Sequence, residues 1–593
     1  MTESALPPAA RTAGRIFAWV LAGILILGVV MTAWVGVRGV MAYGHLRDVQ
    51  NAAGAVSENL SDPTAAAASI DSISSDTSAA RALTSDPIWS FAERLPWIGP
   101  QLEAVSTVAA AADQVVSTSL TPLAEVASTF SLDGLRADDG QIDLTSFEEL
   151  QNPATLGSAG VAAAAASVSN IDPAPLLAPV REAVDQVDDV LVTAADATSA
   201  LAHATVLLPS MLGGEEPRDY LVLFQNNAEW RSLGGIPGAM ALIHTDDGAM
   251  SLAAQESSSD YPKYENSVLP LGDEITTIYG ERPGKWIQNV TQVPDFAVSA
   301  ALAREMWALE HDGEQVDGVI SLDPVALSYL LEATGPVELP TGDVLTSENA
   351  VDLLLNEVYV RYERPADQDA FFAAAAAAVF EKLSSGTDPA KLVASLARAG
   401  DEDRLLLWSA IQSEQQLIAE TTLAGGLPIT DENVSTFGAY VNDGTGSKMD
   451  YYLDTDVDAQ WDSCSVDASG TAQGTATLTL TVTNSAPSDA AALPNYITGG
   501  GSFGVDPGIA RTIGYLYLPA GFELMDATMS DDSGFGGAMH DGRRVLSFAS
   551  DLASGEQVTA TVTARSTMPT GAELSVRQTP TIEEPVAVSD LCG

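Results

Sequence analysis

Positive charge and cysteine are scarce in this 593-residue sequence. Lysine and arginine together number 26 against 80 aspartates and glutamates, which gives a formal net charge of −54 at pH 7. Such a field repels phosphate backbones, so we expect no nucleic acid among the partners. The acidity also keeps an alanine-rich, lysine-poor surface soluble, and this is its simplest interpretation.

The only two cysteines, Cys464 and Cys592, flank a strand-rich C-terminal region. In a reducing cytoplasm this placement has no obvious use. Outside the membrane a disulfide would tie the last residues to the first strand of the region. Closing so long a loop would contribute about 4 kcal/mol. We therefore expect a disulfide in an extracytoplasmic domain.

The motifs of well-known enzymes and metal sites are also missing. The five histidines are scattered without HExxH spacing, and the sequence has neither a P-loop nor a dinucleotide-binding fingerprint. No histidine lies near enough to the cysteines to predict a zinc site. We therefore predict no metal and no cofactor, and no catalytic residue can be assigned from a complete motif.

One long apolar run is present. Residues 16–37 read IFAWVLAGILILGVVMTAWVGV and carry no charge. About 20 residues are needed to cross a membrane as a helix, and Trp19 and Trp34 lie near the ends, where indoles favour the interface. A cleaved signal peptide would have a shorter apolar region and a small-residue cleavage site. The run therefore predicts an uncleaved transmembrane helix.

The orientation of this helix depends on several weaker signals. Arg11 and Arg15 precede the run and favour a cytoplasmic tail over residues 1–15, whereas Arg38 and Arg47 partly offset them. The cysteine pair and the lack of a second span decide the orientation. We expect a single-pass protein of a bacterial cytoplasmic membrane, with its N-terminus inside and the bulk of the chain outside.

Residues 44–210 have helical spacing. Apolar residues from Leu177 to Leu208 hold heptad spacing, and two prolines in LPWIGP (residues 95–100) predict a turn between helices. Residues 133–154 are expected to form a connection. The pattern predicts an α-helical stalk or bundle, which serves either as a spacer or as a coiled coil that binds a partner.

Residues 216–445 alternate strands and helices. YLVLF (220–224) and MALIH (240–244) are buried-strand runs, and the strand in VDGVISLD leads to a helix that begins at Pro324 and ends at Gly335. A later helix is expected around residues 405–417. This alternation predicts an α/β layered domain.

From about residue 450 the chain changes to alternating apolar and polar residues. TATLTLTVTN, RTIGYLYL, RRVLSFA and QVTATVTA read as strands separated by short turns. Residues 450–593 therefore predict a β-sandwich, closed by the expected disulfide.

The segments FQNNAEWRSLGGIPGAM, WIQNVTQVPDF and VDGVISLDPVALSYLLEATGPVELP resemble a bacterial family catalogued as domain of unknown function 4012. That family is typically membrane-anchored and extracytoplasmic, and its name assigns no function. The resemblance implies the same location for this chain.

The order of elements also resembles, more distantly, the LytR-CpsA-Psr family, which transfers glycopolymers from a lipid pyrophosphate carrier to the cell wall. The segment from Lys285 to Asn289 is similar to that family's Lys-Ile-Asn motif, with two extra residues. The segment YVRYER is similar to its arginine motif: Arg361 matches the first arginine directly, and Arg364 is displaced by one position from the second. The stretch DQDAFFAAAA lacks the arginines that follow in that family. Phosphate recognition depends on converging guanidinium groups.

The sharpest polar cluster follows the strand YLVLF. Asn226, Asn227, Glu229 and Arg231 precede two glycines, at a strand end where α/β folds build ligand sites. The same residues also fit a structural Arg–Glu pair above a tight turn. Both interpretations stay open.

Two functions follow from these patterns. In the first, the outer domains bind or organise cell-envelope polymers or protein partners without catalysis. In the second, the α/β domain is a transferase, with a divalent cation expected only in this case. The transferase needs four basic side chains to converge on one cleft, namely Arg231, Lys285, Arg361 and Arg364. Asn289 would belong to the polar cluster, and the carboxylate of Asp323 would assist the reaction.

Overall fold

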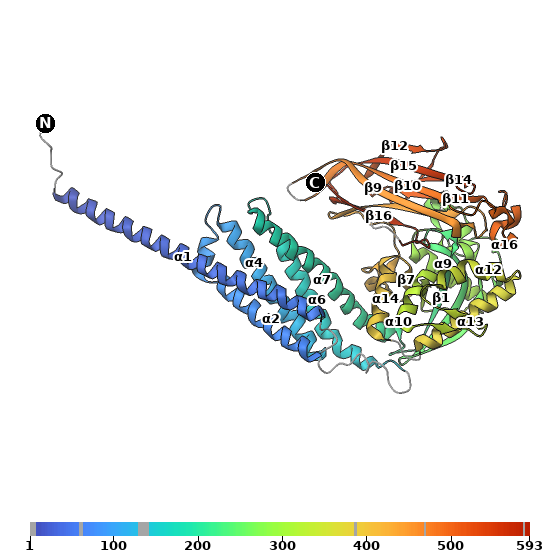
Figure 1. Ribbon diagram of the computed structural model, residues 1–593, viewed down its shortest axis with the longest axis horizontal. Helices are drawn as coiled ribbons and strands as arrows, with labels where there is room; N and C mark the ends of the chain where they lie inside the picture. Colours follow the sequence, from blue (N-terminus) through green and yellow to red (C-terminus); the bar gives the residue numbers. More distant parts are fainter. Residues whose placement is uncertain are drawn as a thin grey trace. The chain divides into compact units, whose positions relative to one another are not determined.

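The computed structural model describes residues 8–58, 63–127, 141–384, 388–467, 470–584 and 588–592. The chain forms two compact units (Figure 1). Unit 1 comprises Met1–Leu135 and Asp143–Pro209, and unit 2 comprises Arg136–Ile142 and Ser210–Gly593.

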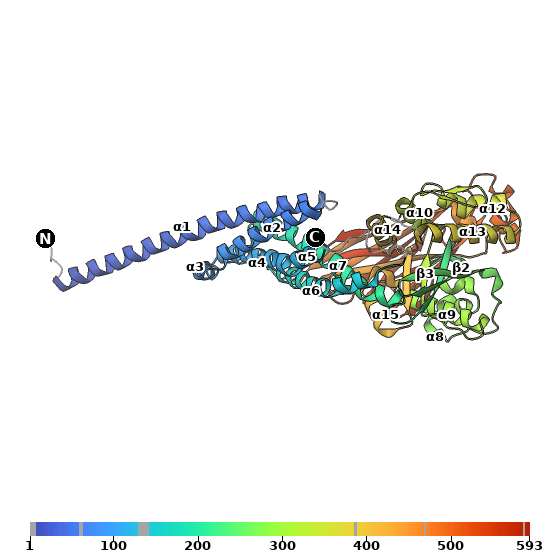
Figure 2. The same cartoon turned by 90° about the horizontal axis from the view of Figure 1, so that it is seen from below.

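Unit 1 is helical. Figures 1 and 2 show its long helices side by side, with the N-terminal part of α1 extending beyond the others. Small residues such as Ala104, Ala164 and Val168 fill the core between α4, α6 and α7, which lets the helices pack closely. The long helices are α1 (Pro8–Glu58), α2 (Pro63–Thr84), α4 (Gly99–Val115), α6 (Leu144–Ser169) and α7 (Ala178–Met211).

Shorter helical segments connect these helices. The segment α3 (Pro87–Ala92) precedes the LPWIGP turn, which separates it from α4 as predicted. A π-helical turn, η1 (Val116–Leu120), and α5 (Thr121–Ala127) follow α4. The predicted connection over residues 133–154 is wrong in its second half. Residues 133–140 lie outside the described residues, but α6 begins at Leu144.

The start of α6 has a clear physical cause. The Asp143 carboxylate accepts a hydrogen bond from the Thr145 backbone N–H at 3.1 Å and so caps the first turn. The aspartates and glycines that indicated a connection are concentrated before this cap. Pro153 lies inside the helix without ending it.

Among the described residues, two helices are long and apolar enough to cross a membrane by length and composition. In the first, Phe17–Val49, none of the most apolar window is buried, whereas 22% of the corresponding window of α7 is buried. The sequence alone indicates a single such helix. In α7, Val184 and Leu191 pack against α4 and α6, as expected for a helix of a bundle.

Unit 2 begins with a five-stranded mixed sheet in the order β3-β2-β1-β4-β7. β1 pairs antiparallel with β2 and parallel with β4. Successive residues of β1 are buried on both faces, because helices cover both (Figure 2). The strands are β1 (Arg218–Arg231), β2 (Gly234–Asp246), β3 (Ala249–Ser257), β4 (Gly318–Leu322) and β7 (Leu405–Ser409).

The helices around this sheet largely follow the predicted pattern. On one face lies α9, whose Phe296 and Trp307 pack with Leu221 and Leu223 of β1. The predicted helix from Pro324 is confirmed as α10, with Asp323 as its N-cap and Gly335 as its C-cap. The helices are α8 (Gly272–Tyr279), α9 (Phe296–Glu310), α10 (Pro324–Thr334), α11 (Ala350–Asp352), α12 (Val358–Arg361), α13 (Pro365–Ser384), α14 (Pro389–Asp401) and α15 (Gln412–Ile418), with a π-helical turn η6 (Leu353–Glu357) between α11 and α12.

The predicted helix over residues 405–417 is wrong in its first part. Leu405–Ser409 is the strand β7, which pairs antiparallel with β4, and α15 begins only at Gln412. The periodicity of a short apolar run fits a buried strand and a buried helix equally well. Here the run forms a strand because its backbone pairs with the edge of β4.

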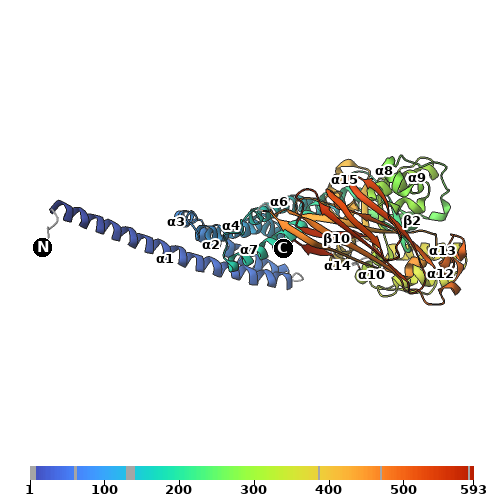
Figure 3. The same cartoon turned by 90° about the horizontal axis from the view of Figure 1, so that it is seen from above.

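Among the described residues, the remainder of unit 2 contains two further large sheets and a two-stranded one of β5 (Val337–Glu338) and β6 (Val344–Leu345). Figure 3 shows the long strands of the large sheets, including β10. Both sheets contribute to one hydrophobic core, with Leu478 and Val562 from the first and Phe437 and Leu546 from the second. The first has the order β12 (Phe522–Met529), β15 (Gln557–Ser566), β10 (Ala472–Asn484) and β9 (Leu453–Val466), and the second β13 (Gly536–His540), β14 (Arg543–Leu552), β11 (Ala510–Tyr517), β8 (Val434–Asp443), β16 (Glu573–Gln578) and β17 (Ser589–Leu591).

Two features of these sheets bear on the predictions. Cys464 of β9 and Cys592, next to β17, form a disulfide, which confirms the expected bond. β8 pairs with β11 and β16 although it lies within residues 216–445, the range predicted for the α/β domain. The two parts of unit 2 therefore overlap in sequence.

Candidate functional site

The C-terminal end of β1 carries the predicted polar cluster. β1 pairs with β4 only from Tyr220 to Phe224, and its last residues extend beyond that partner before the turn to β2. At this turn Gly234 has a φ of +124°, and a Cβ on Gly235 would lie 2.1 Å from the backbone oxygen of Asn226. The glycines are therefore required by the close approach of β1 and β2.

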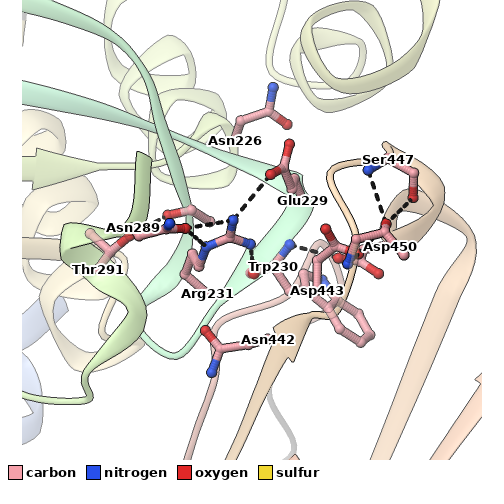
Figure 4. Close-up of polar contacts among 12 residues, drawn as sticks. Asn226, Glu229, Trp230, Arg231, Asn289, Thr291, Asn442, Asp443, Ser447 and Asp450 are labelled. Carbon is pink, nitrogen blue, oxygen red and sulfur yellow. Dashed lines mark hydrogen bonds and ion pairs between the residues drawn. The ribbon is translucent and has the colours of Figure 1, made fainter. Parts of the chain in front are cut away.

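Arg231 lies inside the protein, with all its contacts supplied by its neighbours (Figure 4). Its Nη2 donates to Glu229 Oε1 at 3.1 Å and to Asn289 Oδ1 at 2.9 Å. Its Nε donates to the same Asn289 oxygen at 3.1 Å, and Nη1 donates to the Trp230 carbonyl at 2.6 Å. Four of the five N–H groups of the guanidinium therefore donate to acceptors that the protein itself supplies.

Glu229 has a second cationic partner that the sequence did not indicate. The Lys448 Nζ donates to Glu229 Oε2 at 2.5 Å, although the two residues are 219 positions apart. Burial works against ionisation of Glu229, but the charges of Lys448 and Arg231 outweigh burial and lower its pKa below the ordinary value. Glu229 is therefore a carboxylate held between two buried cations.

Two further carboxyl groups, Asp443 and Asp450, join this cluster from the end of β8 and the segment that follows it. Burial, reinforced by the charge of Glu229, raises the pKa of Asp443 to about 7. Burial and the nearby Asp443 raise the pKa of Asp450 well above its ordinary value. Asp450 Oδ2 accepts the Trp230 backbone N–H at 2.7 Å, whereas Asp450 Oδ1 and Asp443 Oδ2 are buried without a hydrogen-bond partner among the described residues.

Charge balance explains these opposite shifts. Three carboxyl groups and two cations would leave an excess negative charge in a buried space, which is costly. Protonation of one aspartate removes the excess, and Asp443 and Asp450, which have no direct ion pair, take a proton more readily than Glu229. The cluster can therefore hold a proton. Within the described ranges, no group of three or more His, Cys, Asp or Glu residues is placed to hold a metal ion.

The remaining members of the polar cluster have structural partners. Asn227 Nδ2 donates to Asp323 Oδ2 and to the Pro580 carbonyl, both at 3.0 Å, and Asn226 Nδ2 donates to the Tyr359 hydroxyl. Asp323 Oδ1 accepts the Ala326 N–H at 2.7 Å and so caps α10.

Asp323 also pairs with a buried cation. Arg404 Nη1 lies 3.0 Å from Asp323 Oδ2, and the Arg404 side chain has no exposed surface. The carboxylate proposed to assist a transferase is therefore used to cap a helix and to neutralise an arginine.

The other basic candidates are also paired, each with carboxylates of its own. Lys285 Nζ lies 2.6 Å from Glu281, and Arg364 Nη2 lies 2.7 Å from Asp367. Arg361 pairs with Asp343 at 2.7 Å and with Glu357. The side chain of Arg364 is 79% exposed and that of Arg231 only 7%. These contacts do not bring the four basic side chains into one cleft.

A small cavity of about 110 Å³ lies elsewhere in unit 2, between α13 and the strands β2 and β3. Its lining includes the apolar side chains of Phe224, Met240 and Phe372 and three carboxylates. None of the site residues predicted from the sequence lines it. The carboxylates are Glu256, Asp260 and Asp369.

Residues 215–359 match the model of a protein family described as "Protein of unknown function (DUF4012)". This match confirms the nearer of the two resemblances and gives no support to the more distant one. The matched segment includes Asn226, Glu229, Arg231 and Asp323 but ends before Lys448 and the two aspartates of the buried cluster. No curated protein matches the chain.

Proposed function

We propose that this protein, whose residues 215–359 match a family of unknown function, is a membrane-anchored, non-catalytic binding protein of the bacterial cell envelope. One observation carries the proposal. α1 exposes a long row of large apolar side chains, such as Trp19 at 78%, Ile24 at 62% and Leu27 at 59%, and no described part of the chain covers them. In water such a surface would be very costly, whereas in a bilayer it is satisfied.

The membrane span is a single one, over residues 16–37, with the N-terminus inside. α7 is assigned to the bundle because it packs against α4 and α6. Arg38 lies 3.2 Å from the carboxylate of Asp86, so its charge is neutralised locally. Arg11 and Arg15 then favour a cytoplasmic N-terminus, and the Cys464–Cys592 disulfide supports an oxidising compartment for the bulk of the chain.

We also infer that the two C-terminal sheets form a β-sandwich. The support is their common core, to which inward side chains of β10, β15, β8 and β14 contribute. The strands β10 and β15 alternate buried with more exposed residues along much of their length, as expected where two sheets pack face to face.

A binding role is better supported than catalysis. The charged groups of the predicted site neutralise one another inside the fold, and the transferase alternative lacks four free basic groups. The cavity below α13 is far smaller than the roughly 300–1,000 Å³ of small-molecule pockets. It therefore suits one side chain of a protein partner. Glu256 already pairs with His311 at 2.7 Å, so the lysine or arginine that we propose would meet the carboxylates of Asp260 and Asp369.

The location is tested with a cysteine variant of the full-length protein. Ala200→Cys places a thiol at an exposed position of α7, and the native cysteines are already bonded. We expect a membrane-impermeant maleimide to label this thiol in spheroplasts whose cytoplasmic membrane is intact. Labelling only after lysis would overturn the extracytoplasmic location.

The binding role is tested by calorimetric titration with a short lysine-containing peptide. Asp369→Asn should weaken binding, because Asp369 lines the cavity. Asp367→Asn is the matched control, since this neighbour on α13 pairs with Arg364 at the surface. Equal affinities in the two variants, or no binding by the unaltered protein, would contradict this role of the cavity.

A further inference from the structure

The turn between α3 and α4 exposes an apolar tip, defined here as Phe91, Leu95, Trp97 and Ile98. The exposed fractions are 54% for Phe91, 43% for Leu95, 92% for Trp97 and 56% for Ile98. Arg94 is also exposed beside them. Four large apolar side chains so close in the chain form a concentrated patch, unlike the scattered apolar residues that are normal on a protein surface.

The backbone at the tip holds Trp97 in an unfavourable conformation. Its φ is +73°, in the left-handed region that bulky residues rarely adopt. The indole is almost fully exposed, so contacts within the protein do not compensate for this cost. A strained aromatic residue that is presented to the outside indicates a role in contact with something else.

The contacts of α3 place the tip at the end of the apolar part of α1. Arg38, the first residue after the apolar run, donates to the backbone oxygens of Leu83 at 2.9 Å and Ala82 at 2.7 Å. It also pairs with Asp86, the N-cap of α3. The Trp89 ring lies against Gly39, where an added Cβ would be 3.6 Å from it.

The figures agree with these contacts. Figures 2 and 3 show α3 at the end of the helical bundle from which the N-terminal part of α1 emerges. The tip therefore lies beside the part of α1 at which the apolar run of residues 16–37 ends.

We infer that the apolar tip inserts into the outer surface of the membrane beside α1, as a second, interfacial attachment. The inference rests on the proposed anchoring by residues 16–37. At that level the tip meets the headgroup region, where tryptophan is favoured and where Phe, Leu and Ile can reach the acyl boundary. Arg94 fits anionic headgroups, and the acidity of the rest of the protein is screened over about 8 Å at physiological salt.

The two attachments together fix the orientation of the bundle. A single helix alone leaves the attached unit free to tilt about the membrane surface. A second contact beside it removes that freedom and holds the bundle at a defined angle to the bilayer.

The test uses the full-length protein in vesicles of phosphatidylethanolamine and phosphatidylglycerol. A fluorophore is attached at Arg94→Cys, and quenching is measured with a lipid that carries a spin label near its headgroup. We expect strong quenching at this position.

The matched control is a label at Ala200→Cys, which should not be quenched. The start of α7 lies close to the tip, because the Leu177 backbone N–H donates to Gln101 Oε1 at 3.0 Å. Ala200 is about 20 residues further along α7, which corresponds to about 30 Å of helix. Equal quenching of the two labels would overturn the inference, because lipid contact would then not be specific to the tip.

A third label, at Leu25→Cys, separates the two proposals. Quenching of a deep lipid probe at Leu25 without headgroup quenching at Arg94 would overturn the interfacial tip and leave the anchor intact. No quenching at either position would overturn the anchor itself. Protection of the Arg94 label by a second copy of the chain would also appear as absent lipid quenching, and it would reject the membrane as the occupant.

Trp97→Gly gives an independent test. Glycine adopts a positive φ without strain, so the melting temperature should stay the same or rise. Quenching of the Arg94→Cys label should nevertheless fall, because the indole no longer holds the tip in the bilayer. Unchanged quenching in this variant would show that Trp97 contributes nothing to membrane contact.

Discussion

Glu229 is a buried carboxylate between Arg231 and Lys448, and its replacement tests the cost of breaking this arrangement. Glu229→Gln leaves both cations without their carboxylate, so we expect the free energy of unfolding to fall by about 3–5 kcal/mol. Urea denaturation provides the measurement. Glu281→Gln is the control, because its pair with Lys285 is partly exposed and should contribute no more than about 1 kcal/mol. Equal losses would argue against a buried charge network.

Asp443 predicts a pH dependence. Its pKa is raised from 3.8 to about 7 in the folded protein, so folding favours the protonated carboxyl. Below pH 3.8 the group is protonated in both states and costs nothing. As the pH rises to about 7 the unfolded state loses the proton first, and the folded state loses a few kcal/mol of stability.

The matching variant is Asp443→Asn, which can still accept the hydrogen bonds of Thr445. We expect it to be more stable than the unaltered protein at about pH 8 and to have a flatter profile of melting temperature between about pH 4 and pH 7. An unchanged slope would assign the titration to other groups, and the neighbouring Asp450 would be the next to replace.

The site could be predicted from the sequence only where its residues are close together in the chain. Asn226, Glu229 and Arg231 lie close together at the C-terminal end of one strand, so the sequence indicates both the cluster and the Arg–Glu pair. Lys448 and Asp450 lie 219 and 220 positions from the residues they contact, and only the fold brings them to β1. No local pattern distinguishes them from surface charges.

At the scale of elements, the sequence is sufficient to predict a helix where its capping residues and its apolar periodicity indicate the same bounds. α10 has an aspartate cap, a proline in its first turn and a glycine after its end, and the structure places it as predicted. β7 was missed because its strand conformation is selected by pairing with β4. The first turns of α6 were missed because the cap at Asp143 was not distinguished from the acidic residues before it.

The disulfide is the element-scale feature with the largest expected effect. It closes a loop across 128 positions and ties the end of β17 to β9. The double variant Cys464→Ser, Cys592→Ser should lose about 4–5 kcal/mol on the chain-entropy model. Urea unfolding of the oxidised, reduced and double-variant proteins is the measurement. The reduced protein and the variant should agree, and a variant as stable as the oxidised protein would show that the bond constrains little.

At the scale of the whole molecule, the buried cluster determines which part of the chain can fold alone. Residues 210–593 contain all of its members, so this segment should unfold cooperatively with the near-UV circular dichroism of packed aromatic residues. Residues 215–359 alone lack Lys448, Asp450 and β7. We expect this shorter segment to bind hydrophobic dyes and to melt without a cooperative transition. Cooperative folding of the shorter segment would contradict the dependence on distant residues.

The connection between Cys464 and Cys592 has a consequence in time. At roughly 5–20 residues per second, the 128 positions between them take roughly 6 to 26 s to synthesise. β8 (Val434–Asp443) waits through a similar interval for one of its two partners, because β16 begins only at Glu573, whereas its other partner β11 begins earlier, at Ala510. A cell that makes this protein must therefore keep one thiol from reacting with others, and one edge of β8 from pairing with others, until the segment with β16 and Cys592 has emerged.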